Sequence, residues 1–180
     1  MVNNIPAGTW QVDATHSEVG FSVKHLMISK VKGRFKDFEG TFITGENPLE
    51  GQVSGKINVA SVDTNDSGRD GHLQSGDFFD AENYPTIDFV STKITADGGD
   101  DFTLEGTITI HGVSQPITLK GEFGGVTVDG YGQTKAAAEL KGKLSRGAHG
   151  LTWNSALEKG GVLVSDDVTL TLDIQAVLQS

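Results

Sequence analysis

Apolar and polar residues alternate with a period of two along nearly every long segment of this chain, and glycine repeatedly takes an apolar position. Within residues 102–112, for example, Leu104, Gly106, Ile108 and Ile110 share one parity, and polar side chains take the other. Successive side chains of a strand point to opposite faces, so this pattern predicts antiparallel strands with one dry face and one wet face. We therefore expect an all-β fold, an antiparallel β-barrel with room inside for an apolar guest.

The segments with this strand signal are separated by turns rich in Asn, Gly, Asp and Ser. Several are longer than the usual five to six or so residues, which favours coiled barrel strands over a flat sandwich. The apolar parity changes between Phe35 and Phe38, which predicts a β-bulge near Asp37. The predicted strands are residues 9–14, 17–28, 31–44, 52–62, 86–96, 102–112, 115–128, 132–146 and 166–178.

Two stretches lack the strand signal. Residues 66–85 begin as a capped turn or short helix and continue with aromatic residues among acidic ones. An irregular stretch of this length inside a compact β domain is usually a functional loop or a lid. The second stretch, residues 147–161, contains Trp153. We expect a short helical or irregular lid segment, in which Phe78, Phe79 and Trp153 are candidate ligand contacts.

Length and charge limit the kind of protein and its partners. The 180 residues fit one barrel domain, residues 1–180, with its core at about 9–178. A net charge of −10 without a Lys/Arg cluster argues against nucleic acid as a partner. The first residues have neither the basic nor the apolar region of a signal peptide, and no segment reaches the ~20 apolar residues that span a bilayer. On this basis we expect a cytoplasmic location.

Motifs for catalysis and metal binding are sparse. The chain has no cysteine, no nucleophile elbow, no phosphate-binding glycine loop and no His-Glu-x-x-His motif. Its histidines lack i, i+2 or i, i+4 spacing, so no metal site and no catalytic residue is predicted.

Two polar residues fall on the apolar parity of their strands. His25 and Arg146 could contact a ligand headgroup at the mouth of the barrel. Arg146 could instead lie at a strand end, in water or bonded to Asp77 or Asp80, and we favour this second interpretation because strand ends are usually wet. Both residues are kept as candidate ligand contacts.

Small residues on the apolar face have two explanations. They could leave volume for a slender ligand, or they could relieve strain where barrel strands bend. Because they recur on several strands and native interiors leave few voids empty, we favour a cavity. These residues are Gly33, Gly55, Gly106, Gly121, Ala136, Ala138 and Gly142.

Four separated blocks of the chain resemble the YceI-like family, in the same order, and together they span about residues 9–178. They are residues 12–27 with 31–35, residues 69–80 with 84–91, residues 107–113, and Ser145-Arg146. The resemblance implies a lipocalin-like extended barrel of about eight antiparallel strands that holds a polyisoprenoid lipid in a long apolar channel. It also implies a helical or irregular segment near residues 66–80, and some members are dimeric, so a homodimer is allowed. The motif positions that match are His25, Arg34, Arg69, Asp70, His72, Asp77, Phe78, Phe79 and Arg146, with implied roles in architecture or at the ligand mouth.

We expect a non-enzymatic protein that carries or stores an isoprenoid-type lipid, a polyprenyl chain or an isoprenoid quinone, without a cofactor. The acidic surface disfavours docking to anionic membranes, so handover to an unidentified protein partner is expected. Two alternatives stay open: a structural or stress-related module with a filled core, and an enzyme for a small apolar substrate with His25 as base. The candidate ligand contacts are Phe21, Val23, His25, Met27, Phe35, Phe42, Ile57, Phe78, Phe79, Phe89, Leu104, Ile108, Leu119, Leu140, Arg146, Trp153 and Leu170.

Overall fold

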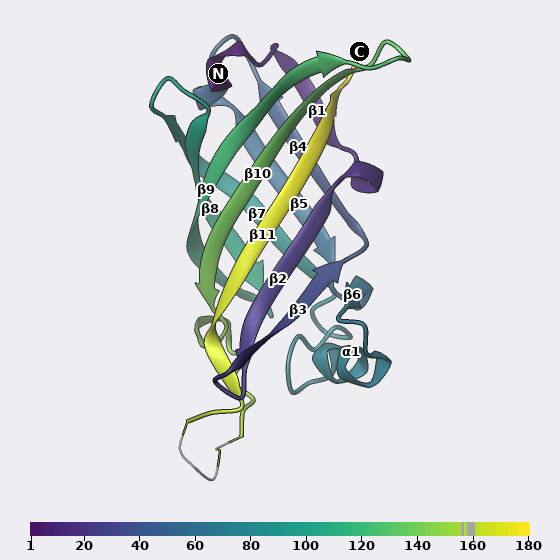
Figure 1. Cartoon of the computed structure of the whole chain (residues 1–180), viewed down its shortest axis with the longest axis vertical. Helices are drawn as coiled ribbons and strands as arrows, with labels where there is room; N and C mark the ends of the chain where they lie inside the picture. The colour runs from purple at the N-terminus through teal and green to yellow at the C-terminus, as the bar shows by residue number, and fades with distance from the viewer. Residues whose placement is uncertain (156, 158–160) are drawn as a thin grey trace.

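The computed structural model describes residues 1–180 except 156 and 158–160, and its strands form one antiparallel sheet that closes into a barrel (Figure 1). Around the barrel the order is β1, β4, β5, β7, β8, β9, β10 and β11, and pairing of β11 with β1 closes the ring. The predicted all-β antiparallel barrel is confirmed. The strands are β1 Gly8–Val12, β2 Glu18–His25, β3 Ser29–Phe35, β4 Phe38–Thr44, β5 Gln52–Asn58, β6 Val62–Asp63, β7 Thr86–Ala96, β8 Asp101–Ile110, β9 Val113–Val128, β10 Thr134–Ser145 and β11 Val164–Leu178.

β1 and β2 follow one another along the same edge of β11. Val12 lies opposite Ala176 and Glu18 lies opposite Asp173. Between these two pairs the chain from β1 to β2 advances six residues, whereas β11 advances only three. The extra residues form a short 3-10 helix, Ala14–His16. β1 and β2 therefore act as one long barrel strand that pairs with β11 and is interrupted by an insertion.

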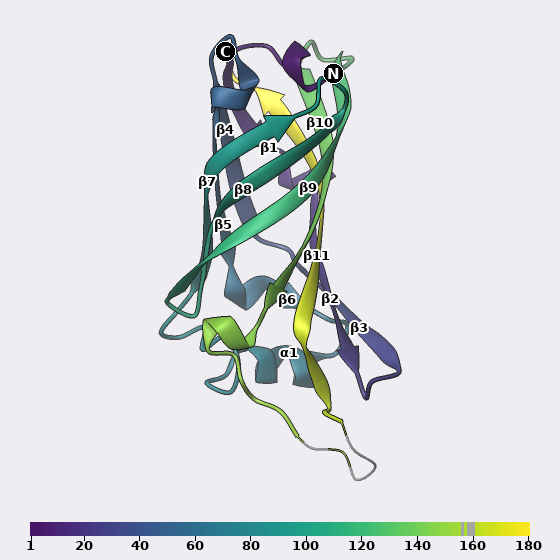
Figure 2. The same ribbon diagram turned by 90° about the vertical axis from the view of Figure 1, so that its left-hand side faces the viewer.

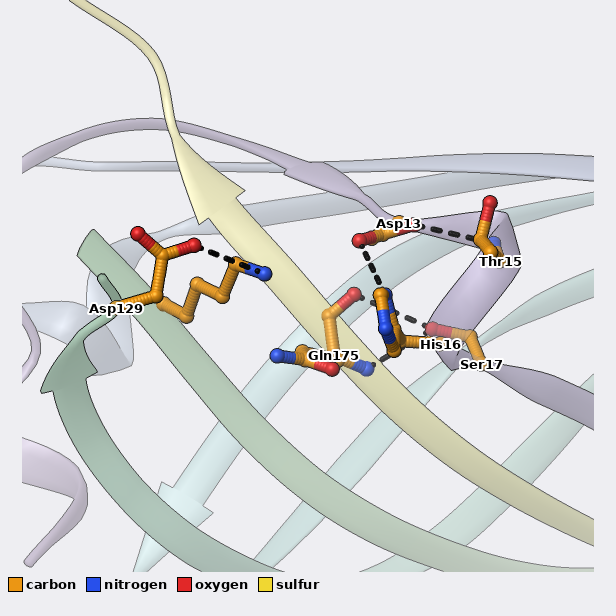
Figure 3. A network of polar contacts seen from close by, with 7 residues as sticks. Asp13, Thr15, His16, Ser17, Asp129 and Gln175 are labelled. Carbon is orange, nitrogen blue, oxygen red and sulfur yellow. Dashed lines mark hydrogen bonds and ion pairs between the residues drawn. The ribbon is translucent and has the colours of Figure 1, made fainter. Parts of the chain in front are cut away.

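Hydrogen bonds to Gln175 of β11 hold this insertion against the sheet (Figure 3). The backbone N–H of Asp13 donates to the Gln175 carbonyl at 2.8 Å, and the Gln175 N–H donates to Ser17 Oγ at 2.9 Å. The Asp13 carboxylate accepts from the Thr15 N–H at 3.0 Å and lies 2.8 Å from His16 Nδ1. Backbone groups that lost their ladder partners at the insertion thus find new ones.

The parity change predicted between Phe35 and Phe38 is confirmed, since both side chains face the barrel interior. Its structural form differs from the prediction. Instead of a bulge inside one strand, the chain breaks at Lys36 and Asp37 into β3, which pairs with β2, and β4, which pairs with β1. The break between β3 and β4 therefore accompanies the insertion between their two partner strands, β2 and β1.

The two ends of the barrel differ (Figures 1 and 2). Both chain termini lie at one end, which we call the terminal end. The opposite end carries the helix α1, Ser67–Gln74, and the β2–β3 hairpin, and we call it the helix end. There β3 pairs with β6 only at Arg34 and Phe35, and β5 ends at Asn58 opposite Thr86, where β7 begins. α1 and the turns that follow it occupy this part of the wall, where the sequence predicted a helical or irregular segment.

Buried side chains close the terminal end. Trp10 is 1% exposed, and its indole N–H donates to the Pro6 carbonyl at 3.0 Å. Val2 and Pro48 are buried beside it, and the Val2 N–H donates to the Gly99 carbonyl at 3.3 Å. The short N-terminal segment is therefore part of the packed structure.

In the described residues, no helix has both the length and the apolar character needed to cross a bilayer.

The carboxylate at the β1–β2 insertion makes stability depend on pH. The hydrogen bond to His16 holds the pKa of Asp13 below its ordinary value of 3.8, the Thr15 N–H adds to this effect, and burial opposes it. Because the folded pKa lies below the unfolded one, the stabilisation is present above this value and is lost as the pH falls through the folded pKa.

We predict that Asp13→Asn lowers the free energy of unfolding by about 1 kcal/mol at about pH 5, and that the difference from the parent chain vanishes near about pH 2. Urea unfolding at both pH values measures this. Asp101→Asn, at the exposed start of β8, is the control and should change stability by less than about 0.5 kcal/mol. An Asp13→Asn difference that persists unchanged in acid would contradict the assignment.

Candidate functional site

A cavity of about 550 Å³ fills the barrel from the terminal end to the helix end. Val2, Trp10 and Pro48 line it at the terminal end, and Leu73 and Trp153 line it at the helix end. Almost all of the lining between them consists of aliphatic and aromatic side chains that the period-two pattern turns inward. Such a space accepts an apolar molecule and offers few partners to a polar one.

The cavity reaches the surface at the helix end. Its lining residues at the terminal end include the buried Val2 and Trp10, whereas at the helix end His25, His72 and Trp153 are only half-buried. The buried Val2, Trp10 and Pro48 cover the terminal end of this channel, and the half-buried His25, His72 and Trp153 indicate an opening at the helix end, near α1 and the β2–β3 hairpin.

The structure brings all but one of the candidate ligand contacts to this channel. The exception is Met27, which is 51% exposed, because β2 ends at His25 and the chain turns at Leu26 and Met27 with φ of 55° and 64°. The prediction that the strand continues to residue 28 and turns Met27 inward is wrong. The residues in the lining are Phe21, Val23, His25, Phe35, Phe42, Ile57, Phe78, Phe79, Phe89, Leu104, Ile108, Leu119, Leu140, Arg146, Trp153 and Leu170.

Several inward glycines lie beneath a phenyl ring of the neighbouring strand. Phe21 lies opposite Gly33 and Phe102 opposite Gly121, and a Cβ at either glycine would collide with that ring. At Gly106 a Cβ would lie 2.5 Å from the Phe89 ring. Ring-over-glycine packing of this kind fixes strand pairs and covers the bare backbone.

This packing corrects the simple expectation that each glycine leaves its own empty volume. The space above Gly33, Gly106 and Gly121 is filled by Phe, and a Cβ at Gly142 would meet Leu119 at 2.6 Å. Because the rings are accommodated at the wall, they do not have to project into the centre of the barrel. Glycine therefore contributes to the channel through the placement of its aromatic neighbour.

An aromatic cluster lies at the helix end of the channel. The His72 ring packs edge-on against Phe78 and Trp153, with centroids 5.1 and 4.9 Å away, and Phe78 and Trp153 are 5.3 Å apart. His72 Nε2 lies 2.8 Å from the Asp77 carboxylate. The cluster joins α1 to the segment after β10, so it connects the two stretches that were predicted to be irregular.

Sequence reasoning missed part of the lining at both ends. Val2 and Pro48 lie outside the predicted strands, and Trp10 lies in the predicted strand 9–14 but was not among the candidate contacts. His72 and Leu73 lie on a helix whose position over the channel has no periodic signal. The parity of Trp10 within residues 9–14 was the one available signal, because Trp10 and Val12 share a face.

Arg146 is 7% exposed and is held by backbone carbonyls. Nε donates to Ser165 at 2.8 Å, Nη1 to Leu151 and Trp153 at 2.8 and 2.9 Å, and Nη2 to Val164 at 3.1 Å. Burial lowers the pKa of the guanidinium, and the nearby Asp166 carboxylate opposes this shift. The predicted position at a strand end is confirmed, because β10 ends at Ser145. The predicted exposure to water or bonding to Asp77 or Asp80 is wrong, since the guanidinium is buried and bonded to backbone carbonyls.

Through these hydrogen bonds, Arg146 instead links β11 to the segment that carries Trp153. A planar guanidinium can bond several carbonyls at once, as a lysine ammonium cannot.

Among the described residues, no group of three or more His, Cys, Asp or Glu side chains is arranged to hold a metal ion.

Comparison with known proteins assigns this architecture to a family. The family model of the YceI-like domain matches residues 10–176. Protein YceI of Escherichia coli is 40% identical over 141 residues, which are 77% of this chain and 73% of that protein. The crystal structure of the Campylobacter jejuni YCEI protein superposes with a TM-score of 0.75 at 35% identity, covering 87% of this chain and 90% of that one.

A third likeness concerns the fold alone. A polyisoprenoid binding domain from Saccharophagus degradans superposes with a TM-score of 0.70 at 15% identity, covering 94% of this chain and 98% of that one. The resemblance that the sequence motifs indicated is confirmed by the family model and by the more similar relatives.

We predict that Gly121→Ala destabilises the fold by about 1–3 kcal/mol, because the new methyl group must displace the Phe102 ring. Gly55→Ala is the control, because Gly55 is another glycine of a barrel strand and a Cβ there meets only the Glu39 carbonyl, at 3.6 Å. Its stability should stay within about 0.5 kcal/mol of the parent chain. Urea denaturation of both variants measures the difference, and equal effects would disprove the ring-over-glycine account.

We predict that Arg146→Lys lowers the free energy of unfolding by about 2–4 kcal/mol, because one ammonium group cannot satisfy the carbonyls of Leu151, Trp153 and Val164 together. Tryptophan fluorescence should shift to the red as Trp153 loses its fixed position. Lys143→Arg, an exposed exchange on the same strand, should leave both readings unchanged. An Arg146→Lys variant as stable as its parent would refute the linking role.

Proposed function

The chain belongs to the YceI-like family, and we propose that its barrel binds an isoprenoid-type lipid, a polyprenyl chain or an isoprenoid quinone, without catalysing a reaction on it. The observation that carries this proposal is the apolar channel of about 550 Å³, whose terminal end is covered by the buried Val2, Trp10 and Pro48. This volume lies within the range of roughly 300–1,000 Å³ that small-molecule sites occupy in proteins.

Burial of hydrocarbon is sufficient to hold such a ligand. Each CH₂ removed from water contributes about 0.8 kcal/mol, so some twenty buried carbons supply about 16 kcal/mol. The loss of translational and rotational freedom costs about 4–15 kcal/mol. The balance allows binding without a charged anchor, which agrees with a lining that is almost entirely apolar.

A polar head would meet His25 rather than Arg146. Four of the hydrogen bonds that the Arg146 guanidinium can make already go to backbone carbonyls. His25 is half-buried at the open end of the channel and lines it. We therefore place the tail of the lipid toward Trp10 and its head near His25.

The polyisoprenoid binding domain of Saccharophagus degradans supports the proposal at the level of the fold, since the same architecture there accommodates a ligand of this class. The alternative of a module with a filled core disagrees with the channel. The enzyme alternative has little support. Apart from the strand pairing, the hydrogen bonds that His25 makes within the described part of the chain go to its backbone carbonyl, from Ser29 and Ile28. Nothing in them orients the ring as a base. A homodimer, a cytoplasmic location and the lack of a cofactor stay predictions.

The first test identifies a resident lipid. The chain is purified from cells without detergent and denatured, the solution is extracted with organic solvent, and the extract is examined by mass spectrometry. The purified chain, stripped of lipid, is then titrated with a polyprenol and with an isoprenoid quinone. Neither a co-purified isoprenoid nor saturable uptake of either probe would refute the proposal.

We predict that filling the channel weakens the binding of the lipid. Ala138→Phe places a ring on the inner face of β10, and Glu139→Phe places the same ring on the exposed outer face next to it. The affinity of Ala138→Phe for the polyprenol should fall by at least about tenfold, because the ring occupies ligand volume. Glu139→Phe should bind like the parent chain. Equal affinities of both variants would show that the lipid binds elsewhere.

A further inference from the structure

The tip of the β2–β3 hairpin exposes a run of large apolar side chains. Leu26 is 40%, Met27 51% and Ile28 87% exposed, and Val162 on the adjoining segment is 38% exposed. The Leu26 N–H donates to the Leu163 carbonyl at 2.9 Å, so Val162 lies next to this turn in the chain that flanks it. We call Leu26, Met27, Ile28 and Val162 the apolar tip.

The backbone of the turn makes these side chains unexpected. Leu26 and Met27 both have positive φ, 55° and 64°. His25 pairs with Ser29, and within the three-residue loop between them the Ile28 N–H donates to the His25 carbonyl at 3.2 Å, so Leu26 and Met27 are the central residues of a tight turn. A turn with positive φ at both central residues strongly prefers Asn-Gly, because bulky side chains are strained there. The chain therefore keeps two large apolar residues where small polar ones would be both more stable and better hydrated.

Three lysines lie on the outer face of the hairpin, on the strands that lead to the apolar tip. Lys24 lies directly opposite Lys30, and Lys32 lies opposite Ser22, one step further along the same face. All three lysines are exposed. Like charges opposite each other across a strand pair are unfavourable unless an anion lies near them. This patch is basic in a chain whose net charge is −10.

The same hairpin forms one side of the channel opening. His25 and Val31 flank the turn and line the channel, and Leu163 and Val164 line it from the adjoining strand. The outer edge of β3 from Ser29 to Gly33 has no strand partner in the described residues, so this side of the opening is a two-stranded projection (Figure 2). A surface that received the apolar tip would lie directly at the mouth.

We propose that the β2–β3 hairpin docks the protein on an anionic lipid bilayer, with the apolar tip inserted among the acyl chains and Lys24, Lys30 and Lys32 at the headgroups. Apolar side chains at the tip and lysines behind them match the layered chemistry of this interface. The net charge argues against attraction to such a surface, but lysines near it act within a Debye length of about 10 Å or less. The inference rests on the proposed function in one respect: it gives the bound lipid a direct route between channel and membrane.

The carboxylates at this end restrict the docking geometry. Asp70 lies on α1, Asp77 and Asp80 lie in the turns after it, and Asp166 and Asp167 lie near the start of β11. Asp166 is engaged by the Gly147 N–H at 2.8 Å. An orientation in which the hairpin leads, with α1 further from the bilayer, keeps the lysines nearest to the headgroups.

The test is flotation of the stripped chain with vesicles of phosphatidylcholine, with or without about 30% phosphatidylglycerol. Binding should require the anionic lipid and should weaken at least about tenfold between about 0.05 and 0.5 M salt. Met27→Asn with Ile28→Ser keeps a turn-compatible residue at the positive φ, so it folds, and it should lose flotation. Lys24→Gln with Lys30→Gln should lose the dependence on phosphatidylglycerol.

Matched controls come from the opposite end and from the barrel wall. Val128 and Tyr131 are exposed apolar side chains at the β9–β10 turn, 62% and 92% exposed. Val128→Ser with Tyr131→Ser, and Lys141→Gln with Lys143→Gln on the outer face of β10, should float like the parent chain. Loss of flotation in these controls, or a parent chain that does not float, would overturn the docking proposal.

Two further measurements distinguish this inference from other outcomes. Uptake of a polyprenol in solution should be the same in the parent chain and the Met27→Asn/Ile28→Ser variant. A parent chain that takes up the polyprenol normally but does not float refutes docking alone. Flotation without any uptake refutes the proposed function alone. Sedimentation of the parent chain as a dimer that the tip variant dissociates, together with absence of flotation, would assign the apolar tip to a second copy and overturn the proposal.

Discussion

Pairing of β11 along both of its edges is the interaction on which the rest of the structure depends. One edge pairs with β10 along almost its whole length, and the other edge is shared between β1 and β2. Without the hydrogen bonds of Gln175 to the insertion between β1 and β2, this second edge would keep unpaired backbone groups. The closed ring leaves few free strand edges and encloses the channel at the same time.

Closure alone does not leave space inside, because an eight-stranded barrel is narrow enough for its own side chains to fill. Here the position of the phenyl rings decides the outcome. Phe21 and Phe102 lie over glycines of the neighbouring strand. The same aromatic content, opposed by larger residues, would occupy the lumen. Ring-over-glycine packing thus serves wall stability and channel width together at Gly33, Gly106 and Gly121.

The alternating pattern predicted the barrel, most of its strands and the inward direction of side chains such as Leu104, Ile108 and Leu170, because side-chain orientation in a strand depends only on parity. It failed where tertiary contacts decide. The apolar run after His25 continues the strand pattern, so nothing in the sequence signals the turn at Met27. Arg146 sits at a strand end, and only the folded chain brings the carbonyls of Leu151 and Trp153 around it. The cover over Gly121 depends on cross-strand register, which parity does not specify.

The plug of Val2, Trp10 and Pro48 at the terminal end has a geometric consequence. A channel with one blind end works as a ruler: a hydrocarbon can advance until its tip meets the plug, and any excess length must stay outside. Isoprenoid lipids with hydrocarbon tails of different length would then place their polar heads at different distances from the channel opening. Selection among them would follow from depth, without any group that recognises the head.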